Sequence, residues 1–188
     1  MNSKRFDRIV IYGSPGCGKS TLANKLSEIF QVNHIHLDDV FWDPNWSIPT
    51  ANEFRSRVKS VLIHDKWIID GNYSKVRDLI LPKATLAIMI DLPLFIIFWR
   101  IIARTITRNT FLKLIELTPL PKKIEETNSG ERIFQAIFEL SSYAIRYKRH
   151  KLKGIEEEVI TTIGKENFYK FHRQEDIDNF LEKLKKKL

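Results

Sequence analysis

The amino-acid sequence predicts an α/β domain built around a parallel sheet. Short apolar runs alternate along the chain with longer segments of helical periodicity, which is the pattern of βαβ units. A glycine-rich stretch, GSPGCGKST at residues 13–21, stands between the first apolar run and the first helical segment. With 188 residues the chain has the length of one ordinary domain, so we expect a single domain over residues 1–188.

The strands are expected where short apolar runs occur, at 8–13, 34–38, 67–70, 86–91 and 168–172. Helices are predicted between and after them, at 19–30, from about Thr50 onward, and at about 175–188. Thr50 and Glu53 have the spacing of a capping box, which is why the second helix is expected to begin there. The last helix places apolar residues on one face, namely Ile177, Phe180, Leu181 and Leu184.

Two polar stretches, 38–50 and 116–131, do not fit simple crossovers between strands. We expect both to be loops on a rigid framework, where binding and catalytic residues often occur. The first lies within a possible acceptor-binding insertion at 38–66.

The composition limits the partners and the compartment. A net charge of +8, from 31 Lys and Arg against 23 Asp and Glu, favours anionic partners. The single cysteine, Cys17, excludes a disulfide framework and fits a reducing compartment. The apolar stretch 86–103 has the length of a membrane span, but Asp91, Pro93 and Arg100 within it favour a strand, a turn and a helix. We therefore expect a cytoplasmic protein with no membrane span; the sequence does not indicate an oligomeric state.

The stretch 13–21 matches the pattern G-x-x-x-x-G-K-[ST] in full. Its glycines allow the backbone to wrap a phosphate chain at a helix N-terminus, where anions are favoured. Such a loop predicts binding of ATP and Mg²⁺, with Lys19 reaching the phosphates and the Ser20 hydroxyl reaching the metal. Cys17 occupies a variable position and is expected to be a small buried filler. The residues expected to bind the nucleotide are Gly13, Ser14, Pro15, Gly16, Cys17, Gly18, Lys19, Ser20 and Thr21.

Other motifs narrow the reaction class. The sequence has no Asn-Lys-x-Asp motif for reading guanine, which disfavours a GTPase. A motor ATPase would show an apolar strand that ends in Asp-Glu, whereas the strand at 67–70 is followed by glycine. At 22.2 kDa the chain also has little room for the extra domains of a transporter ATPase or helicase. A small-molecule kinase fits best; whether ATP or GTP is the donor is left open.

Four segments in order, GSPGCGKST, HLDDVFW, WIIDGNY and IDLP with a following WR, resemble the bacterial topology modulation proteins. These form a branch of the P-loop kinases related to adenylate kinase. The resemblance covers residues 8–108, with a weaker echo at 128–133. It implies a three-layer P-loop NTPase fold with strand order 2-3-1-4-5, helices on both faces, and a lid-like segment at 104–131. The kinship implies phosphoryl transfer, while the family name implies an effect on DNA topology.

Asp70 ends the third predicted strand and is followed by Gly71. In adenylate-kinase-like enzymes this Asp holds a water on Mg²⁺, so the resemblance implies the same role here; the alternative is a plain turn. Those enzymes continue with Phe-Pro-Arg, whereas this chain has Asn72 and Tyr73. This departure puts monophosphate binding there in doubt, and Arg77 is a candidate substitute.

Asp38 closes the second predicted strand at the same sheet edge. Kinases of small hydroxylated metabolites that resemble this chain use an Asp there to bind or deprotonate the acceptor, which predicts Asp38, rather than Asp39, as general base. A turn or cap aspartate is the alternative. Trp42 and Trp46 are candidate walls of the acceptor pocket, or packing residues of an ordered loop.

Arg100, Arg104 and Arg108 are spaced four residues apart and therefore form one stripe on a helix. Arginines stabilise the charge that phosphoryl transfer spreads over the phosphate oxygens. The resemblance makes Arg100 and Arg104 catalytic candidates, with Arg108 and Arg132 further ones near the lid. A solvated charge stripe is the alternative.

His34 and His36 are two residues apart on a strand and share a face. A zinc pair would need a third ligand, and none stands at suitable spacing in the sequence. We expect these histidines to be packed or hydrogen-bonded.

Two further hypotheses come from other classes. One is a nucleic-acid-binding regulator, based on the net charge, the basic cluster RYKRHKLK at 146–153 and the family name. The other is a protein that binds ATP without turnover. The leading hypothesis is phosphoryl transfer to a small acceptor, a nucleotide or a hydroxylated metabolite.

Overall fold

The computed structural model describes residues 6–42, 47–107 and 129–186, with the side chains of 104–107 and 129–136 left aside. A five-stranded sheet has the order β2-β3-β1-β4-β5 and every neighbouring pair is parallel. This confirms the α/β fold and the strand order that the resemblance implied. The strands are β1 (Arg8–Gly13), β2 (His34–His36), β3 (Trp67–Asp70), β4 (Leu86–Ile90) and β5 (Phe168–Phe171).

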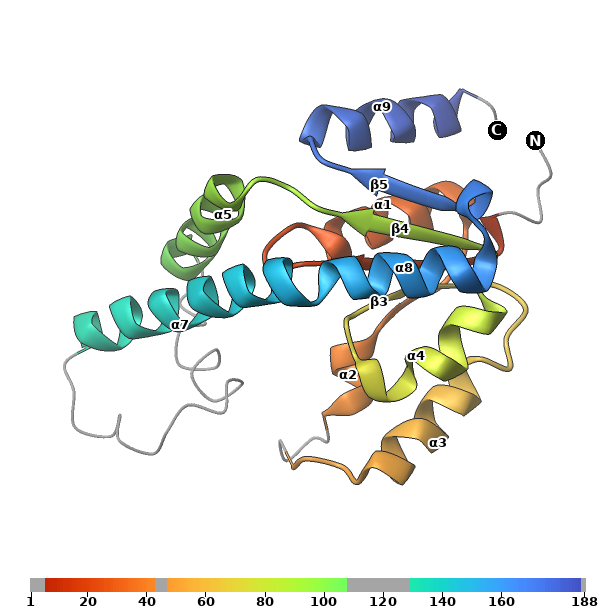
Figure 1. Ribbon diagram of the computed structural model, residues 1–188, viewed down its shortest axis with the longest axis horizontal. Coiled ribbons are helices and arrows are strands. Elements are labelled where there is room, and N and C mark those ends of the chain that lie inside the picture. The colour runs from red at the N-terminus through yellow and green to blue at the C-terminus, as the bar shows by residue number, and fades with distance from the viewer. Residues whose placement is uncertain (1–5, 43–46, 108–128, 187–188) are drawn as a thin grey trace.

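Helices cover both faces of the sheet (Figure 1). One face packs against α1 (Lys19–Phe30), α5 (Leu94–Thr107) and α9 (Gln174–Lys185). The other packs against α3 (Ala51–Val61), α4 (Ser74–Ile80) and α8 (Leu152–Ile163). The long α7 (Ser129–His150) leads into α8 and contributes Ala144 to one core and Tyr147 to the other (Figure 1). The short helices are α2 (Leu37–Phe41), η2 (Leu81–Lys83) and η4 (Lys165–Asn167).

Alternation along the central strands explains the two cores. In β1, Ile9 and Ile11 face α1, whereas Val10 and Tyr12 face α4 and α8. Both sides of a parallel sheet are buried, so these strands are apolar almost throughout. Asp70, at the end of β3, departs from this pattern, since its charged side chain is fully buried.

The predicted helix start at Thr50 is confirmed. The Thr50 hydroxyl accepts a hydrogen bond from the Glu53 backbone N–H at 3.2 Å, and the Glu53 carboxylate accepts from the Thr50 N–H at 2.7 Å. This capping box satisfies donors that the first turn of α3 leaves open.

The prediction for the second strand was too long. β2 ends at His36, and Asp38 lies in the first turn of α2 instead of closing a strand. The reason is pairing: among the described strands β2 lies at the edge of the sheet and pairs with β3 alone, and the last register pair is His36 with Asp70. Beyond it the chain turns at Gly71 and offers β2 no further partner.

Apart from residues 132–163, the remaining differences between the predicted and the observed elements are smaller. β4 and β5 each end one residue earlier than predicted, as is common at strand ends. The apolar stretch 86–103 divides into β4 and α5 around a turn, as expected. Within the described residues, no helix is both long and apolar enough to cross a membrane. The sequence analysis assigned no element to 132–163, where the structure has most of α7 and all of α8.

Gly71 is expected to be intolerant of a side chain. Its φ is +143°, and a Cβ there would lie 2.7 Å from the Cβ of Leu37, the residue that starts α2. Gly71→Ala should therefore lower the free energy of unfolding by about 1–3 kcal/mol in urea denaturation. Gly154→Ala is the control, because a Cβ at this position in α8 meets nothing within 4 Å. The control should raise stability by up to about 1 kcal/mol, and equal losses in the two variants would contradict the argument.

Candidate functional site

The glycine-rich loop joins β1 to α1 at the carboxyl edge of the sheet. Gly18 is the N-cap of α1, no side chain caps it, and the first turn of this helix contains no acidic residue. Its backbone N–H groups and the positive end of the helix dipole therefore favour an anion. Ser14 is buried, Pro15 and Gly16 are half-buried, and Thr21 is exposed on the first turn of α1.

Gly13 and Cys17 pack against each other inside the loop. A Cβ on Gly13 would lie 2.6 Å from both Cys17 Sγ and the Ile90 carbonyl oxygen. The Cys17 side chain is fully buried, and burial raises the pKa of its thiol. Cys17 is thus the small, unreactive filler that its position predicted.

The Lys19 ammonium lies over the loop. It donates hydrogen bonds to the carbonyl oxygens of Gly13 at 3.0 Å and Ser14 at 3.2 Å. The ammonium is thereby held beside the N-terminus of α1. The charge of Lys19 and the backbone N–H groups of the helix can therefore attract one anion together.

Ser20 and Asp70 are 50 residues apart in sequence and in direct contact in the fold. The Ser20 hydroxyl donates to Asp70 Oδ2 at 2.6 Å. Parallel pairing of β1 with β3 brings the end of β3 beside the loop that follows β1. The pair that the sequence analysis predicted for the metal is therefore brought together, with two oxygen ligands of the kind that Mg²⁺ prefers.

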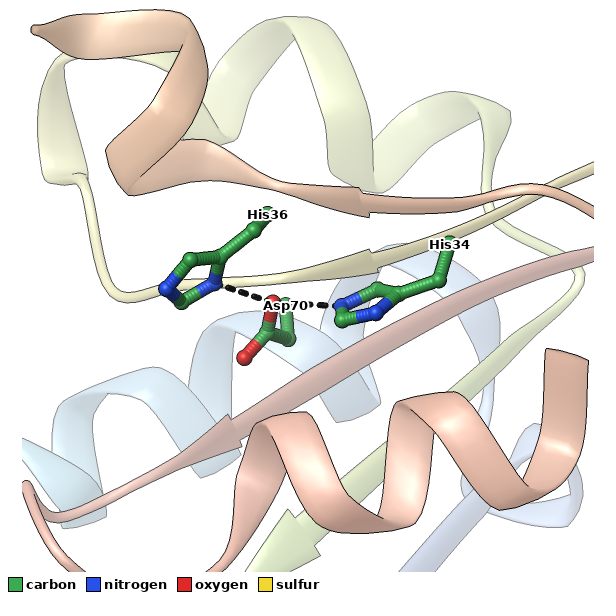
Figure 2. Close-up of side chains that lie close together, drawn as sticks. All are labelled: His34, His36 and Asp70. Carbon is green, nitrogen blue, oxygen red and sulfur yellow. Dashed lines mark hydrogen bonds and ion pairs between the residues drawn. The ribbon is translucent and has the colours of Figure 1, made fainter.

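The second oxygen of Asp70 faces two histidines of β2 (Figure 2). His34 Nε2 lies 2.8 Å and His36 Nδ1 lies 2.6 Å from Asp70 Oδ1. Burial opposes ionisation of Asp70, but hydrogen bonds from His34, His36 and Ser20 outweigh it and lower the pKa of this carboxyl. Hydrogen bonds to Asp38 and Asp70 raise the pKa of His36 to about 10.

Asp38 is joined to this cluster through His36. Asp38 Oδ2 lies 3.2 Å from His36 Nε2, and its Oδ1 accepts a hydrogen bond from the Tyr73 hydroxyl at 2.8 Å. Burial favours the neutral acid, but these hydrogen bonds are stronger and lower the pKa of Asp38. The Asp38 side chain is 54% exposed, so a molecule in solution can reach the carboxylate.

Asn72 fastens the start of the loop to the end of β3. Its amide donates to the Gly13 carbonyl oxygen at 2.6 Å, and its Oδ1 accepts from the Gly13 N–H at 3.4 Å. Tyr73, the next residue, packs its ring against Phe41 and Phe54 while its hydroxyl holds Asp38. The two residues that depart from the Phe-Pro-Arg pattern thus support the loop and Asp38.

Arg100 reaches the loop from α5. Its guanidinium donates to the Cys17 carbonyl oxygen at 2.7 Å and to Gln174 Oε1 at 2.7 Å. Of the arginine stripe, Arg100 alone has a described side chain. Arg104 lies in α5 with its side chain outside the described part, as does the side chain of Arg132 in α7, and Arg108 lies outside the described residues.

Other candidates lie elsewhere or outside the described residues. Arg77 pairs with Glu158 of α8 at 2.6 Å and lies over the Tyr12 ring, on the sheet face opposite α1. Trp42 ends α2 with its ring edge-on to Phe41, while Trp46 is outside the described residues. Most of the predicted lid, 108–128, is outside them too, so that division of the chain stays a prediction.

The expectation that His34 and His36 are hydrogen-bonded is confirmed, but the sequence analysis did not predict Asp70 as their partner, nor the contacts of Asn72 and Tyr73 with the loop and Asp38. The sequence indicated these contacts by position alone: the two histidines share one face of a strand, and Asn72 and Tyr73 follow Asp70. No further potential ligand stands near the histidines in the sequence, but the neighbouring strand places Asp70 in register with His36.

Comparison with known proteins found kinases that resemble part of the sequence or the fold of this chain. A segment of 69 residues is 33% identical to adenylate kinase from Pseudothermotoga lettingae, covering 37% of this chain and 30% of the relative. The match thus spans less than a third of that protein's length. No family model matches the chain. Shikimate kinase from Bacteroides thetaiotaomicron superposes with a TM-score of 0.50 over 96% of this chain and 97% of its own. At 12% identity this likeness shows a common fold.

Proposed function

We propose that the protein transfers a phosphoryl group from ATP to the hydroxyl or phosphate of a small acceptor. The observation that carries the proposal is the direct contact of Ser20 with the buried Asp70, at the N-terminus of a helix that begins with Lys19. A glycine-rich turn without a bound phosphate chain would have no need of a buried carboxylate against its serine. The kinship with P-loop kinases supports the same reaction class.

On the donor side, the loop N–H groups and Lys19 would hold the phosphates, and Arg100 would support the loop through the Cys17 carbonyl. Ser20 and Asp70 have oxygen atoms of the kind that Mg²⁺ prefers, and they would hold the ion, Asp70 through a water molecule. When bound, the ion supplies positive charge that stabilises the transferring phosphoryl group.

On the acceptor side, Asp38 would accept the proton of the attacking group. Its carboxylate is ionised, accessible and held in place by Tyr73 and His36. Such a positioned base typically contributes about 10²–10⁴-fold to the rate. Asp38 lies in the first turn of α2, two residues after the end of β2, and ligands of parallel sheets bind at this carboxyl edge.

Assays with labelled ATP against a panel of nucleoside monophosphates and hydroxylated metabolites should reveal transfer to at least one acceptor. Asp38→Asn should lower kcat for that acceptor about 10²-fold or more, while calorimetry finds the ATP affinity unchanged. Asp39→Asn is the matched control, because Asp39 is the exposed neighbour on the same helix and should retain activity.

Three results would count against parts of this proposal. Absence of both transfer and ATP binding would remove the function as a whole. ATP binding without transfer to any acceptor would favour the nucleotide-binding protein without turnover. Full activity of Asp38→Asn would show that Asp38 is not the base, and it would not affect the proposal for the ATP side of the site.

The proposal does not include DNA binding or an effect on DNA topology. Within the basic cluster at 146–153, Lys148 pairs with Asp91 at 2.7 Å, while Arg146, Arg149 and Lys151 are exposed on α7 and the junction with α8. Exposed positive charge at one end of a helix is equally typical of a solvated surface.

A further inference from the structure

His34, His36 and Asp70 form a cluster of metal-ligating side chains at the edge of the sheet (Figure 2). One ligand atom of each residue lies within 4.8 Å of the others. The Asp70 side chain is fully buried, and those of His34 and His36 are 13% and 31% exposed, so the cluster is shielded on the Asp70 side and open to an ion from solution at His36.

The outer nitrogen of each ring already has an oxygen acceptor. His34 Nδ1 lies 2.7 Å from Asn24 Oδ1 on α1, and His36 Nε2 lies 3.2 Å from Asp38 Oδ2. Metal-ligating histidines almost always donate their other N–H to such an oxygen, which orients the ring and fixes its tautomer. Both histidines therefore have the supporting hydrogen bond that a metal ligand needs.

These hydrogen bonds at the outer nitrogens determine whether the inner nitrogens, which face Asp70, carry a proton or a lone pair. Carboxylate and amide oxygens accept hydrogen bonds, so the nitrogens that face them, His36 Nε2 beside Asp38 and His34 Nδ1 beside Asn24, are the donors of the two rings. In neutral rings, His34 Nε2 and His36 Nδ1 would then direct lone pairs at Asp70 Oδ1, itself an acceptor. Both nitrogens lie within 3 Å of this oxygen, and a cation, either protons on the rings or a metal ion, relieves the repulsion between such lone pairs.

We propose that this cluster is a binding site for a divalent transition-metal ion of the zinc class, with His34 Nε2, His36 Nδ1 and Asp70 Oδ1 as ligands. Two neutral imidazoles and a carboxylate are a common ligand set for Zn²⁺, with a fourth position for water. Two carboxylates, Asp70 and Asp38, balance the two charges of the ion. Ligand atoms in tetrahedral Zn²⁺ sites are about 3.3 Å apart, so the two N···O contacts would open by roughly half an ångström.

This site is chemically distinct from the proposed Mg²⁺ contact, although both use Asp70. Its Oδ2 faces Ser20 and its Oδ1 faces the histidines. Imidazole nitrogen selects Zn²⁺, Co²⁺ or Ni²⁺ over Mg²⁺, which prefers oxygen. Binding at the histidines therefore does not depend on ATP or on the proposed transfer reaction.

The site is tested by calorimetric titration of the metal-free 188-residue chain with Zn²⁺ in the absence of nucleotide. We expect one ion per chain, with no competition from millimolar Mg²⁺, and Co²⁺ should give the intense visible bands of a tetrahedral complex. His36→Ala should weaken binding at least about 100-fold, and Asn24→Ala, which keeps all three ligands, by about 10–100-fold. His64→Ala is the control, since His64 lies on an exposed turn after α3 and should bind like the unmodified chain.

Lys19→Ala separates this proposal from the kinase function, because it removes a phosphate contact but no metal ligand. It should bind Zn²⁺ with unchanged affinity. The site is overturned if His36→Ala and His34→Ala bind Zn²⁺ as tightly as the unmodified chain, which would leave a protonated, hydrogen-bonded histidine pair. If the histidine variants do not fold, as judged by circular dichroism, unchanged Zn²⁺ affinity in Asn24→Ala overturns it, since that exposed position on α1 tolerates alanine.

Discussion

Lys19→Ala is expected to reduce phosphoryl transfer by about 10²–10³-fold, the usual cost of losing one preorganised donor at a developing charge. The ammonium lies at the N-terminus of α1, 3.0 Å from the Gly13 carbonyl oxygen, where the phosphate chain is proposed to bind. The affinity for ATP should also fall about tenfold or more, since hydrogen bonds to charged groups contribute about 1.5–3 kcal/mol. Initial rates and calorimetry with ATP measure the two effects.

Lys25→Ala is the matched control for this variant. Lys25 lies on the same helix, six residues further on, and its side chain is exposed. Its replacement removes one positive charge without touching the loop, so rate and affinity should stay within a factor of about two, as surface substitutions usually do. Equal losses in both variants would mean that net charge matters and the position of Lys19 does not.

Asp70→Asn is expected to reduce both activity and stability. The substituted asparagine would keep the shape of the side chain but lose the charge to which Ser20, His34 and His36 are bonded. Removing one partner of a buried charged pair costs about 3–5 kcal/mol, so the urea midpoint should fall clearly. The transfer rate should fall about 10²-fold or more, because the oxygen that faces Ser20 and the proposed Mg²⁺ loses its negative charge.

Asp65→Asn is the control for Asp70→Asn. Asp65 lies just before β3 with 98% of its side chain exposed, and its ion pair with Arg8 is long, at 3.6 Å. Exposed ion pairs of this kind contribute little to stability, so the free energy of unfolding should change by no more than a few tenths of a kcal/mol. The transfer rate should stay close to that of the unmodified chain. An Asp70→Asn variant with normal stability and normal rate would contradict both the buried charge network and the proposed metal contact.

Local patterns were sufficient for much of the fold. The apolar runs predicted four of the five strands to within a residue, and Thr50 and Glu53 predicted the start of α3. These features depend on neighbours in sequence, as capping and strand periodicity do. The prediction for β2 was wrong at its end because a strand's length depends on its partner, and β3 stops at Asp70.

For the site, the sequence together with the resemblance predicted that the glycine-rich loop and Asp70 lie on one sheet edge, since a motif and a strand end suffice to place both there. Only the tertiary structure decided what surrounds Asp70. The parallel register of β2 with β3 sets His36 opposite Asp70, and the packing of α1 brings Asn24 to His34. These contacts join residues 10 to 36 positions apart, so no local spacing could have indicated them.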